Sequence, residues 1–230
     1  MIFPYGDDQV KGGHFPLFSY ALIAVNLAVF LFEVSLPLPL REAFLMKYAA
    51  IPAHILRGED FYTLFTSMFL HGGWMHLLGN MLFLWVFADN IEALSGSFKF
   101  LIFYFLGGLL AHAAHIYFNA SSVIPTVGAS GAISAVMGAY LLLFPRSRVR
   151  VLFFVFPFGI PAFIFLFVWI FQQLLNGQAS LQVATAESSG VAWWAHIGGF
   201  AFGVLAGIWF RITLRRPSPP AAVAYRRPFR

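Results

Sequence analysis

The sequence predicts an all-α membrane protein, built as a bundle of six transmembrane helices. Two features of its composition indicate this class: of the 230 residues, 60% are hydrophobic and only 10% are charged. A soluble domain usually carries about 25% charged residues, so a soluble protein of this composition could not cover its surface with polar groups. The third observation is that the apolar residues form continuous runs of about 20, the length that a helix needs to cross a bilayer.

Six apolar runs are candidates for the spanning helices. They cover residues 17–37, 75–92, 98–118, 127–144, 150–175 and 193–213. Each run is continuous rather than alternating between apolar and polar residues, which is typical of helices in lipid. We therefore expect residues 17–213 to form one membrane domain.

The segments outside the runs are expected to lie at or beyond the membrane surfaces. Residues 1–16 are short and polar and are interpreted as a cytoplasmic segment rather than a cleavable signal peptide. Residues 38–73, between the first two runs, mix apolar and basic side chains, which favours structure lying in the outer interface. Residues 214–230 are rich in Pro and Arg and are expected to be a disordered, basic cytoplasmic tail.

The distribution of basic residues predicts the orientation. If the loops alternate between the two sides of the membrane, one side holds 11 of the 14 Lys and Arg residues, and the other holds only Arg41, Lys47 and Arg57. Basic residues collect in cytoplasmic loops, so both ends of the chain are expected to be cytoplasmic. This placement accounts for the net charge of +5 without a nucleic-acid partner. The lack of organelle-targeting features favours a prokaryotic plasma membrane.

Polar residues inside a membrane are functional candidates by default, and three of the runs begin with them. The second run begins with His76 and Asn80, which are four residues apart and hence on one helix face. The fourth begins with Ser130 and the sixth with His196. Because these three runs cross the membrane in the same direction, all four side chains should lie at a similar depth below the outer surface.

Small residues predict which helix faces meet, because stripes of them let two backbones approach closely in lipid. Such stripes are formed by Gly199, Gly203 and Gly207 in the sixth run and by Ser130, Ser134 and Gly138 in the fourth. His196 lies on the stripe face of its helix, so contact between the stripes should bring its ring near the Ser130 hydroxyl. Histidine is the usual base that makes a serine nucleophilic.

A third, acidic member of such a site is not expected. None of the nine acidic residues falls in the outer half of the second, fourth or sixth run, so packing and neutral hydrogen bonds would have to replace an orienting carboxylate. Acyl transfer also needs donors for an oxyanion. The side chains of His76 and Asn80 are candidates, as is the backbone N–H of Ser130 at its helix start.

These segments resemble the three signatures of the rhomboid family of intramembrane serine proteases. The matching segments are HGGWMHLLGN at residues 71–80, Gly128-Ala129-Ser130-Gly131, and Ala195-His196-Ile197-Gly198-Gly199. Their order and spacing match over roughly residues 15–213, as does the six-helix core. The resemblance implies hydrolysis of peptide bonds in or near the transmembrane helices of membrane-protein substrates, through a covalent acyl-enzyme and without a metal or other cofactor. It also implies that Ser130 and His196 form a catalytic dyad, with His76, Asn80 and Gly128 at the oxyanion and substrate-binding site.

The chain departs from the family pattern at two places. Many members have a Trp-Arg pair in the first loop, where this chain has Phe61-Tyr62-Thr63. Some members place a Tyr one turn after the nucleophile, where it stacks on the histidine; here that position is Ser134. Support for the His196 ring must therefore come from elsewhere.

Other histidines and the asparagine have simpler interpretations. His71 is more typical of an interfacial residue than of a catalyst. His112 and His115, three residues apart, could form a metal pair, but interfacial packing is favoured. Asn80 could simply join two helices by hydrogen bonds.

Three other functions compete with the protease. An intramembrane metalloprotease would need a motif such as HExxH, and no His in this sequence is followed by Glu. A channel or transporter would show repeats, broken helices or buried charges along a path, and the sequence shows none. An inactive rhomboid-like protein that binds or chaperones membrane proteins would be expected to lack Ser130 or His196.

Overall fold

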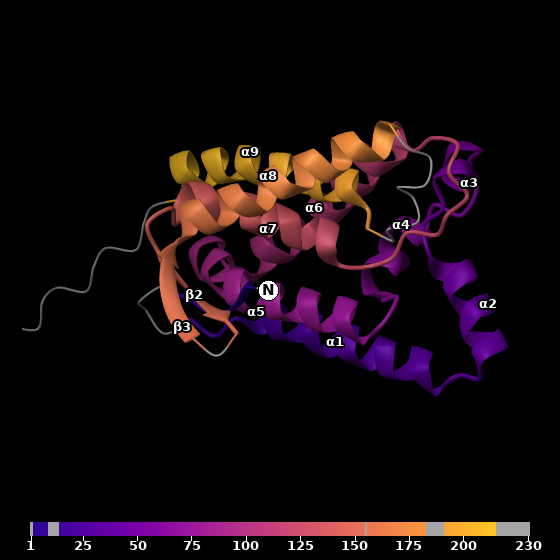
Figure 1. The fold of residues 1–230 in the computed structure, drawn as a ribbon, viewed down its shortest axis with the longest axis horizontal. Coiled ribbons are helices and arrows are strands. Elements are labelled where there is room, and N and C mark those ends of the chain that lie inside the picture. Colours follow the sequence, from indigo (N-terminus) through magenta and orange to yellow (C-terminus); the bar gives the residue numbers. More distant parts are fainter. Residues whose placement is uncertain (1, 9–13, 155, 183–190, 215–230) are drawn as a thin grey trace, which may run out of the picture.

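The structure is a computed structural model that describes residues 2–8, 14–154, 156–182 and 191–214. Over this part of the chain it contains six long apolar helices (Figure 1). They are α1 (Leu17–Ser35), α5 (Trp74–Ser95), α6 (Ser97–Phe118), α7 (Ser130–Leu143), α8 (Ala162–Gln182) and α9 (Trp193–Thr213). The predicted class, a polytopic helical membrane protein, is confirmed.

Five of these helices have 19 to 22 residues and are long and apolar enough to cross a membrane. The exception is α7, which has 14 residues and is therefore only about 21 Å long at 1.5 Å per residue. Figure 1 shows α7 in the middle of the bundle, with α1 and α5 on one side and α8 and α9 on the other. All residues from Gly131 to Tyr140 are buried. A short helix can be accommodated here because protein surrounds it.

The closest helix contact joins α7 to α9, as the glycine stripe predicts. A Cβ atom added to Gly203 would lie 2.0 Å from the carbonyl oxygen of Ala135, and one added to Gly199 would lie 2.2 Å from that of Gly131. These distances are far below contact distance, so the two backbones touch directly. The face that α7 offers is formed by Gly131, Ala135 and Gly138, with Ser134 beside Gly199. It thus includes Ser134 and Gly138 of the predicted stripe.

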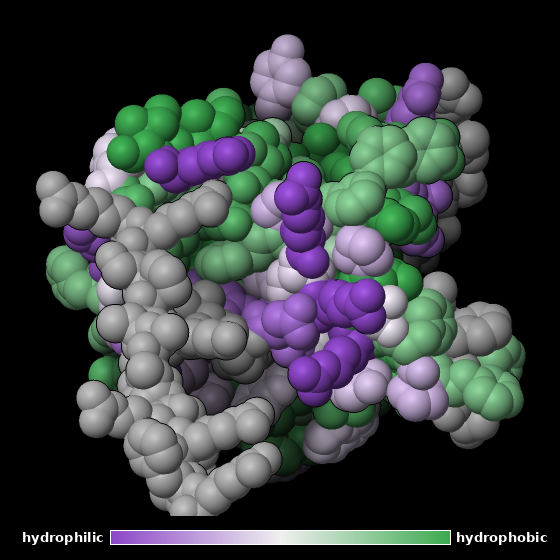
Figure 2. Space-filling view, turned by 90° about the vertical axis from the view of Figure 1, so that its left-hand side faces the viewer, coloured by the Kyte–Doolittle hydropathy of each residue, from purple (hydrophilic) through white to green (hydrophobic). Residues whose placement is uncertain are grey.

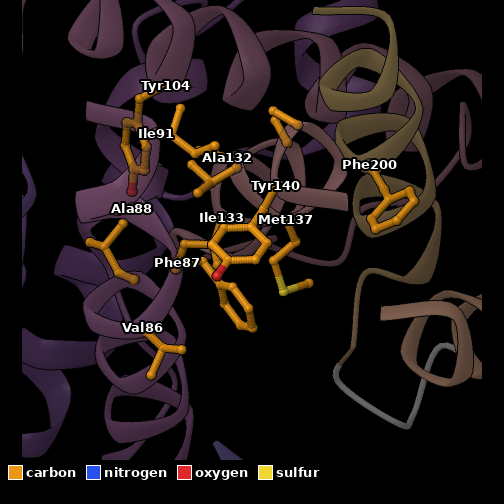
Figure 3. Close-up of a cluster of buried hydrophobic side chains, with 14 of the residues drawn as sticks. Val86, Phe87, Ala88, Ile91, Tyr104, Ala132, Ile133, Met137, Tyr140 and Phe200 are labelled. Carbon is orange, nitrogen blue, oxygen red and sulfur yellow. The ribbon is translucent and has the colours of Figure 1, made fainter. Parts of the chain in front are cut away.

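Aromatic and aliphatic side chains fill the space between the later turns of α7 and its neighbours (Figure 3). Phe87 of α5 meets Tyr140 of α7 edge to face, with ring centroids 5.0 Å apart. Met137 of α7 and Phe200 of α9 belong to the same buried cluster. This core packs around the later turns of α7. The first turn, at Ser130, lies next to the loop that precedes the helix.

The segment between α1 and α5 contains short helices, none long enough to span. They are α2 (Leu38–Tyr48), α3 (Pro52–Leu56), α4 (Thr63–Thr66) and the 3-10 helix η1 (Ser67–Phe69). Where many family members carry Trp-Arg, the Tyr62 hydroxyl donates a hydrogen bond to the Lys47 carbonyl (2.9 Å). The segment is also tied to the approach to α7, since Ala50 and Thr126 exchange backbone hydrogen bonds of 3.0 and 2.8 Å.

A small antiparallel sheet, which the sequence analysis did not predict, lies at the other end of the bundle. Its order is β1 (Ile2–Gly6), β2 (Arg148–Phe153) and β3 (Phe156–Pro161). The prediction of a helix from residue 150 was therefore wrong in its first part, and α8 instead begins at Ala162 and runs to Gln182. Basic and apolar residues alternate with a strand period at the start of β2, where Val149 and Val151 are buried. Pro157 and Pro161 also disfavour a helix interior.

The N-terminal segment supplies β1 of this sheet and is also held by a buried carboxylate. The buried Asp7 carboxylate accepts hydrogen bonds from the Tyr140 hydroxyl and from the Asn90 side chain. Burial raises the pKa of Asp7 to about 7, although the Tyr140 hydrogen bond acts in the opposite direction. Figure 2 views this end of the molecule and shows hydrophilic side chains gathered on it.

The glycine contact between α7 and α9 gives a prediction. Gly203→Ala should destabilise the protein by about 1–3 kcal/mol, because the added methyl group must push two backbones apart. Thermal unfolding in detergent measures the loss. Gly79→Ala is the matched control, since its Cβ would meet nothing within 4 Å. Equal midpoints for Gly203→Ala and the parent protein would contradict direct backbone contact as a constraint.

Candidate active site

The loop before α7 positions Ser130. Ser130 is the first residue of the helix, so its backbone N–H is among those without a partner within the helix. Two residues earlier, Gly128 has a φ of +118°, a conformation that favours glycine. A Cβ at Gly128 would also lie 2.7 Å from Nε2 of His76. The Gly128 N–H donates to the Ser67 carbonyl (2.9 Å), which fixes the loop against η1.

His196, in the first turn of α9, meets Ser130 as the sequence analysis expects. The Ser130 Oγ and the His196 Nε2 are 2.8 Å apart, a hydrogen-bond distance. Both side chains are half-buried. The hydroxyl can donate its proton to a bare ring nitrogen, which is the geometry of a nucleophile with its base.

The other ring nitrogen of His196 contacts a residue that the sequence analysis missed. Its Nδ1 lies 2.8 Å from Oε1 of Gln173, in the middle of α8. Gln173 is 4% exposed, and its Nε2 donates to the backbone carbonyl of Trp169 (3.2 Å). A signal was present, because a buried polar side chain in an otherwise apolar run needs a partner. Nothing in the sequence alone identified that partner as the histidine of another helix.

His76 and Asn80 lie together on α5 and face the Ser130 loop. The nearest atoms to the Cβ position of Gly128 are His76 Nε2 and Cε1 and, at 3.4 Å, Asn80 Nδ2. Two potential donors of α5 are therefore beside the chain that leads into Ser130. The structure thus brings together all five site residues singled out from the sequence.

His71, interpreted from the sequence as an interfacial residue rather than a catalyst, packs inside the protein. Its side chain is fully buried, and its Nε2 lies 2.9 Å from the side-chain nitrogen of Asn80. With the amide in this orientation, Asn80 donates and His71 Nε2 accepts. The His71 backbone N–H also donates to Glu33 of α1 (3.3 Å). The turn between η1 and α5 folds inward and makes His71 a support for Asn80.

One cavity of about 920 Å³ joins these groups. Ser130, His196, His76 and Asn80 all line it, and Trp169 of α8 contributes to its wall. Side chains from α5, α7, α8 and α9 therefore line one cavity, in which a bound molecule could contact a nucleophile, a base and hydrogen-bond donors.

His112 and His115 bond to separate partners. His112 Nε2 lies 3.1 Å from the Ser67 hydroxyl, and His115 Nε2 lies 3.0 Å from that of Thr126. Both contacts support segments that lead toward Ser130. Over the described residues, no three His, Asp or Glu side chains are grouped so that they could hold a metal ion. The geometry agrees with the favoured packing role.

Comparisons with known proteins agree on one family. A family model described as a Rhomboid domain matches residues 58–212. The chain is 29% identical over 197 residues to the mitochondrial Rhomboid protein 1 of Saccharomyces cerevisiae, covering 83% of this chain and 52% of that protein. It is 30% identical over 192 residues to Rhomboid protease GluP of Bacillus subtilis, covering 83% of this chain and 34% of that protein. The matches thus span about half of the yeast relative and a third of the bacterial one.

Proposed function

The chain belongs to the rhomboid family, and we propose that it is an intramembrane serine protease that cleaves peptide bonds in or near the transmembrane helices of membrane-protein substrates. The observation that carries the proposal is the 2.8 Å contact between Ser130 Oγ and His196 Nε2 inside the cavity. A serine hydroxyl is a weak nucleophile until a positioned base removes its proton. Family membership supports a protease, and this contact supports a serine nucleophile with a histidine base.

In the proposed reaction, Ser130 Oγ attacks the carbonyl carbon of the scissile peptide bond while His196 Nε2 takes the hydroxyl proton. The carbonyl oxygen becomes an oxyanion. When the tetrahedral intermediate collapses, the C–N bond breaks and His196 gives its proton to the leaving amine. The acyl group remains as an ester on Ser130. A water molecule, deprotonated by His196, then attacks the ester carbon. The bond from that carbon to Ser130 Oγ breaks, His196 returns the proton to Oγ, and the acid is released.

The oxyanion is proposed to be stabilised by three donors: the side chains of His76 and Asn80 and the backbone N–H of Ser130. The Asn80 amide has two N–H groups, and only one is used in the 2.9 Å contact with His71. The second is free to point toward the cavity. Donors held in place before the reaction are worth more than donors that must reorient during it.

The runner-up function is an inactive rhomboid-like protein that binds or chaperones membrane proteins. The yeast relative is named a rhomboid protein and not a protease. The presence of Ser130 and His196 in hydrogen-bond contact favours the protease, because a protein that only binds has no need of that pair.

We propose that both ends of the chain are cytoplasmic and that the cavity opens to the opposite side. The uneven loop distribution of Lys and Arg supports this orientation. One of the relatives is bacterial and another is mitochondrial. We propose a prokaryotic plasma membrane as the location of this chain. We also propose that substrate enters from the lipid past α8.

The orientation can be tested with reporter fusions. A reporter placed after Arg216 should be active only as a cytoplasmic protein, and one inserted within residues 183–190 only as an exported one. The basic loops should remain inside because they are costly to translocate. Two reporters that respond from the same side would contradict the orientation and the common depth of the site residues.

The dyad predicts the outcome of three variants. Ser130→Ala and His196→Ala should each abolish nearly all proteolysis of a transmembrane substrate, and the double variant should cost little more, because the two groups act as a unit. Ser180→Ala is the matched control, since it lines the same cavity but its hydroxyl donates to the Gly177 carbonyl.

A labelled fluorophosphonate should modify Ser130 of the parent protein and should need His196 to do so. Retention of activity by Ser130→Ala would contradict the mechanism. A parent protein that neither cleaves nor reacts with the probe would favour the binding module.

The oxyanion site predicts the effect of Asn80→Ala. Removing one donor should lower kcat by roughly 10²–10³. Loss of the contact with His71 should lower stability by only about 1–3 kcal/mol, so the variant should still fold. Asn119→Ala is the control, because Asn119 lines the cavity but bonds to His115. Unchanged kcat in Asn80→Ala would assign Asn80 to helix association instead.

A further inference from the structure

We infer that Gln173 is the positioning residue of the His196 base: its side-chain oxygen accepts the Nδ1 proton and so holds the ring in the tautomer that presents a bare Nε2 to Ser130. The inference rests on the proposed function, because it assigns a role within the Ser130–His196 pair. Gln173 lies on α8, whereas the side chains of the proposed dyad and oxyanion site lie on α5, α7 and α9.

The direction of each hydrogen bond follows from the chemistry of the side chains. Gln173 contacts the Trp169 carbonyl at 3.2 Å with one end of its amide and His196 Nδ1 at 2.8 Å with the other. A carbonyl can only accept, so the end that faces Trp169 must be the NH₂ group. If the amide were flipped, two oxygens would face each other without a proton between them.

The orientation of the amide then fixes the histidine. Since Oε1 of Gln173 can only accept, His196 Nδ1 must hold a proton. In a neutral imidazole the other nitrogen is then bare, and Nε2 can accept the hydroxyl proton of Ser130 across 2.8 Å. A single backbone carbonyl on α8 thus determines, through two side chains, which nitrogen acts as the base.

Burial makes this contact effective. Gln173 is 4% exposed, so little water competes for its oxygen. The ring centroids of Trp169 and Trp193 lie 5.8 and 6.2 Å from that of His196, at interplanar angles of 37° and 88°. They limit how far the imidazole can turn away from Gln173. Ser134 stands where some family members have a Tyr that stacks on the histidine, so the His196 ring needs other support. The contacts with Gln173 and the two tryptophans supply it.

A neutral acceptor suits this location. A carboxylate at the same place would be a buried charge with no permanent positive partner, which is costly. The amide oxygen still orients the ring, and it still interacts favourably with the imidazolium that forms during the reaction. We therefore expect Gln173 to contribute less to the reaction rate than a triad carboxylate would, but well more than a packing contact.

The test compares three variants of the full chain in detergent. Gln173→Met keeps the length of the side chain and removes the acceptor. Gln173→Glu keeps an acceptor oxygen at the same place. Gln172→Met makes the same chemical change at the neighbouring, exposed position of α8. The probe is a fluorophosphonate, whose phosphorus bonds to Ser130 Oγ as fluoride leaves and His196 takes the proton.

The maximal labelling rate of Gln173→Met should fall at least about tenfold, which is a part of the roughly 10²–10⁴ that a general base supplies. Its half-saturating probe concentration should change little. Gln173→Glu should stay closer to the parent rate, and Gln172→Met should equal it. Nitrogen-15 NMR of the His196 ring, assigned by its loss in His196→Ala, should show the proton on Nδ1 in the parent protein and a mixture of tautomers in Gln173→Met.

Parent-like labelling by Gln173→Met would overturn the inference and leave the dyad intact. A parent protein whose His196 proton is on Nε2 would do the same, and this measurement does not depend on whether any variant folds. Absence of Ser130 labelling in the parent protein would instead overturn the proposed function, and the role of Gln173 with it.

Discussion

The direct contact between the backbones of α7 and α9 is the constraint on which the site depends. Ala135 and Gly203 approach so closely that no side-chain atom fits between them. Ser130 begins α7, and His196 lies in the first turn of α9, so both stand just beyond this contact. The separation of the helix axes therefore sets the distance between hydroxyl and imidazole. Both residues line the cavity, and α7, which has only 14 residues, begins at this pair.

Buried carboxylates elsewhere in the bundle serve to join helices. Glu92, at the end of α5, accepts hydrogen bonds from the backbone N–H groups of Phe18 and Ser19 and from the Ser19 hydroxyl. These are the first N–H groups of α1, where a negative charge is favourable. Glu33 similarly accepts from the His71 backbone. The proposed catalytic groups rely instead on amides, a hydroxyl and imidazoles, which avoids a buried charge beside the nucleophile.

The spanning helices and the main site residues could be predicted from the sequence for a physical reason. Lipid requires long apolar runs, and any polar group within them must have a use, so Ser130, His196, His76 and Asn80 stood out against an apolar background. A polar residue in a loop does not stand out in this way. Nor does the apolar background show which residue of another helix is the partner of a polar side chain. His71 looked interfacial for this reason, and Gln173 could not be paired with His196 without the packing of α8.

The hairpin before α8 was misread because its residues are as apolar as those of a helix. Residues 150–161 are rich in Phe and Val, and hydropathy alone cannot separate a strand from the first turns of a spanning helix. The alternating Arg and Val residues from Arg148 and the prolines at 157 and 161 carried the information about local structure.

The position of β1 has a consequence for the order in which the molecule is completed. Ile2 pairs with Phe153, and Asp7 is held by Tyr140, so residues at the very start of the described chain find their partners well over a hundred residues later. A ribosome delivers the start of a chain first, at about 5–20 residues per second. Of the three strands described, β1 is thus made first, and it must wait several seconds for β2 while α1, α5, α6 and α7 are made. It can pair only after residue 153 of the 230 has been added.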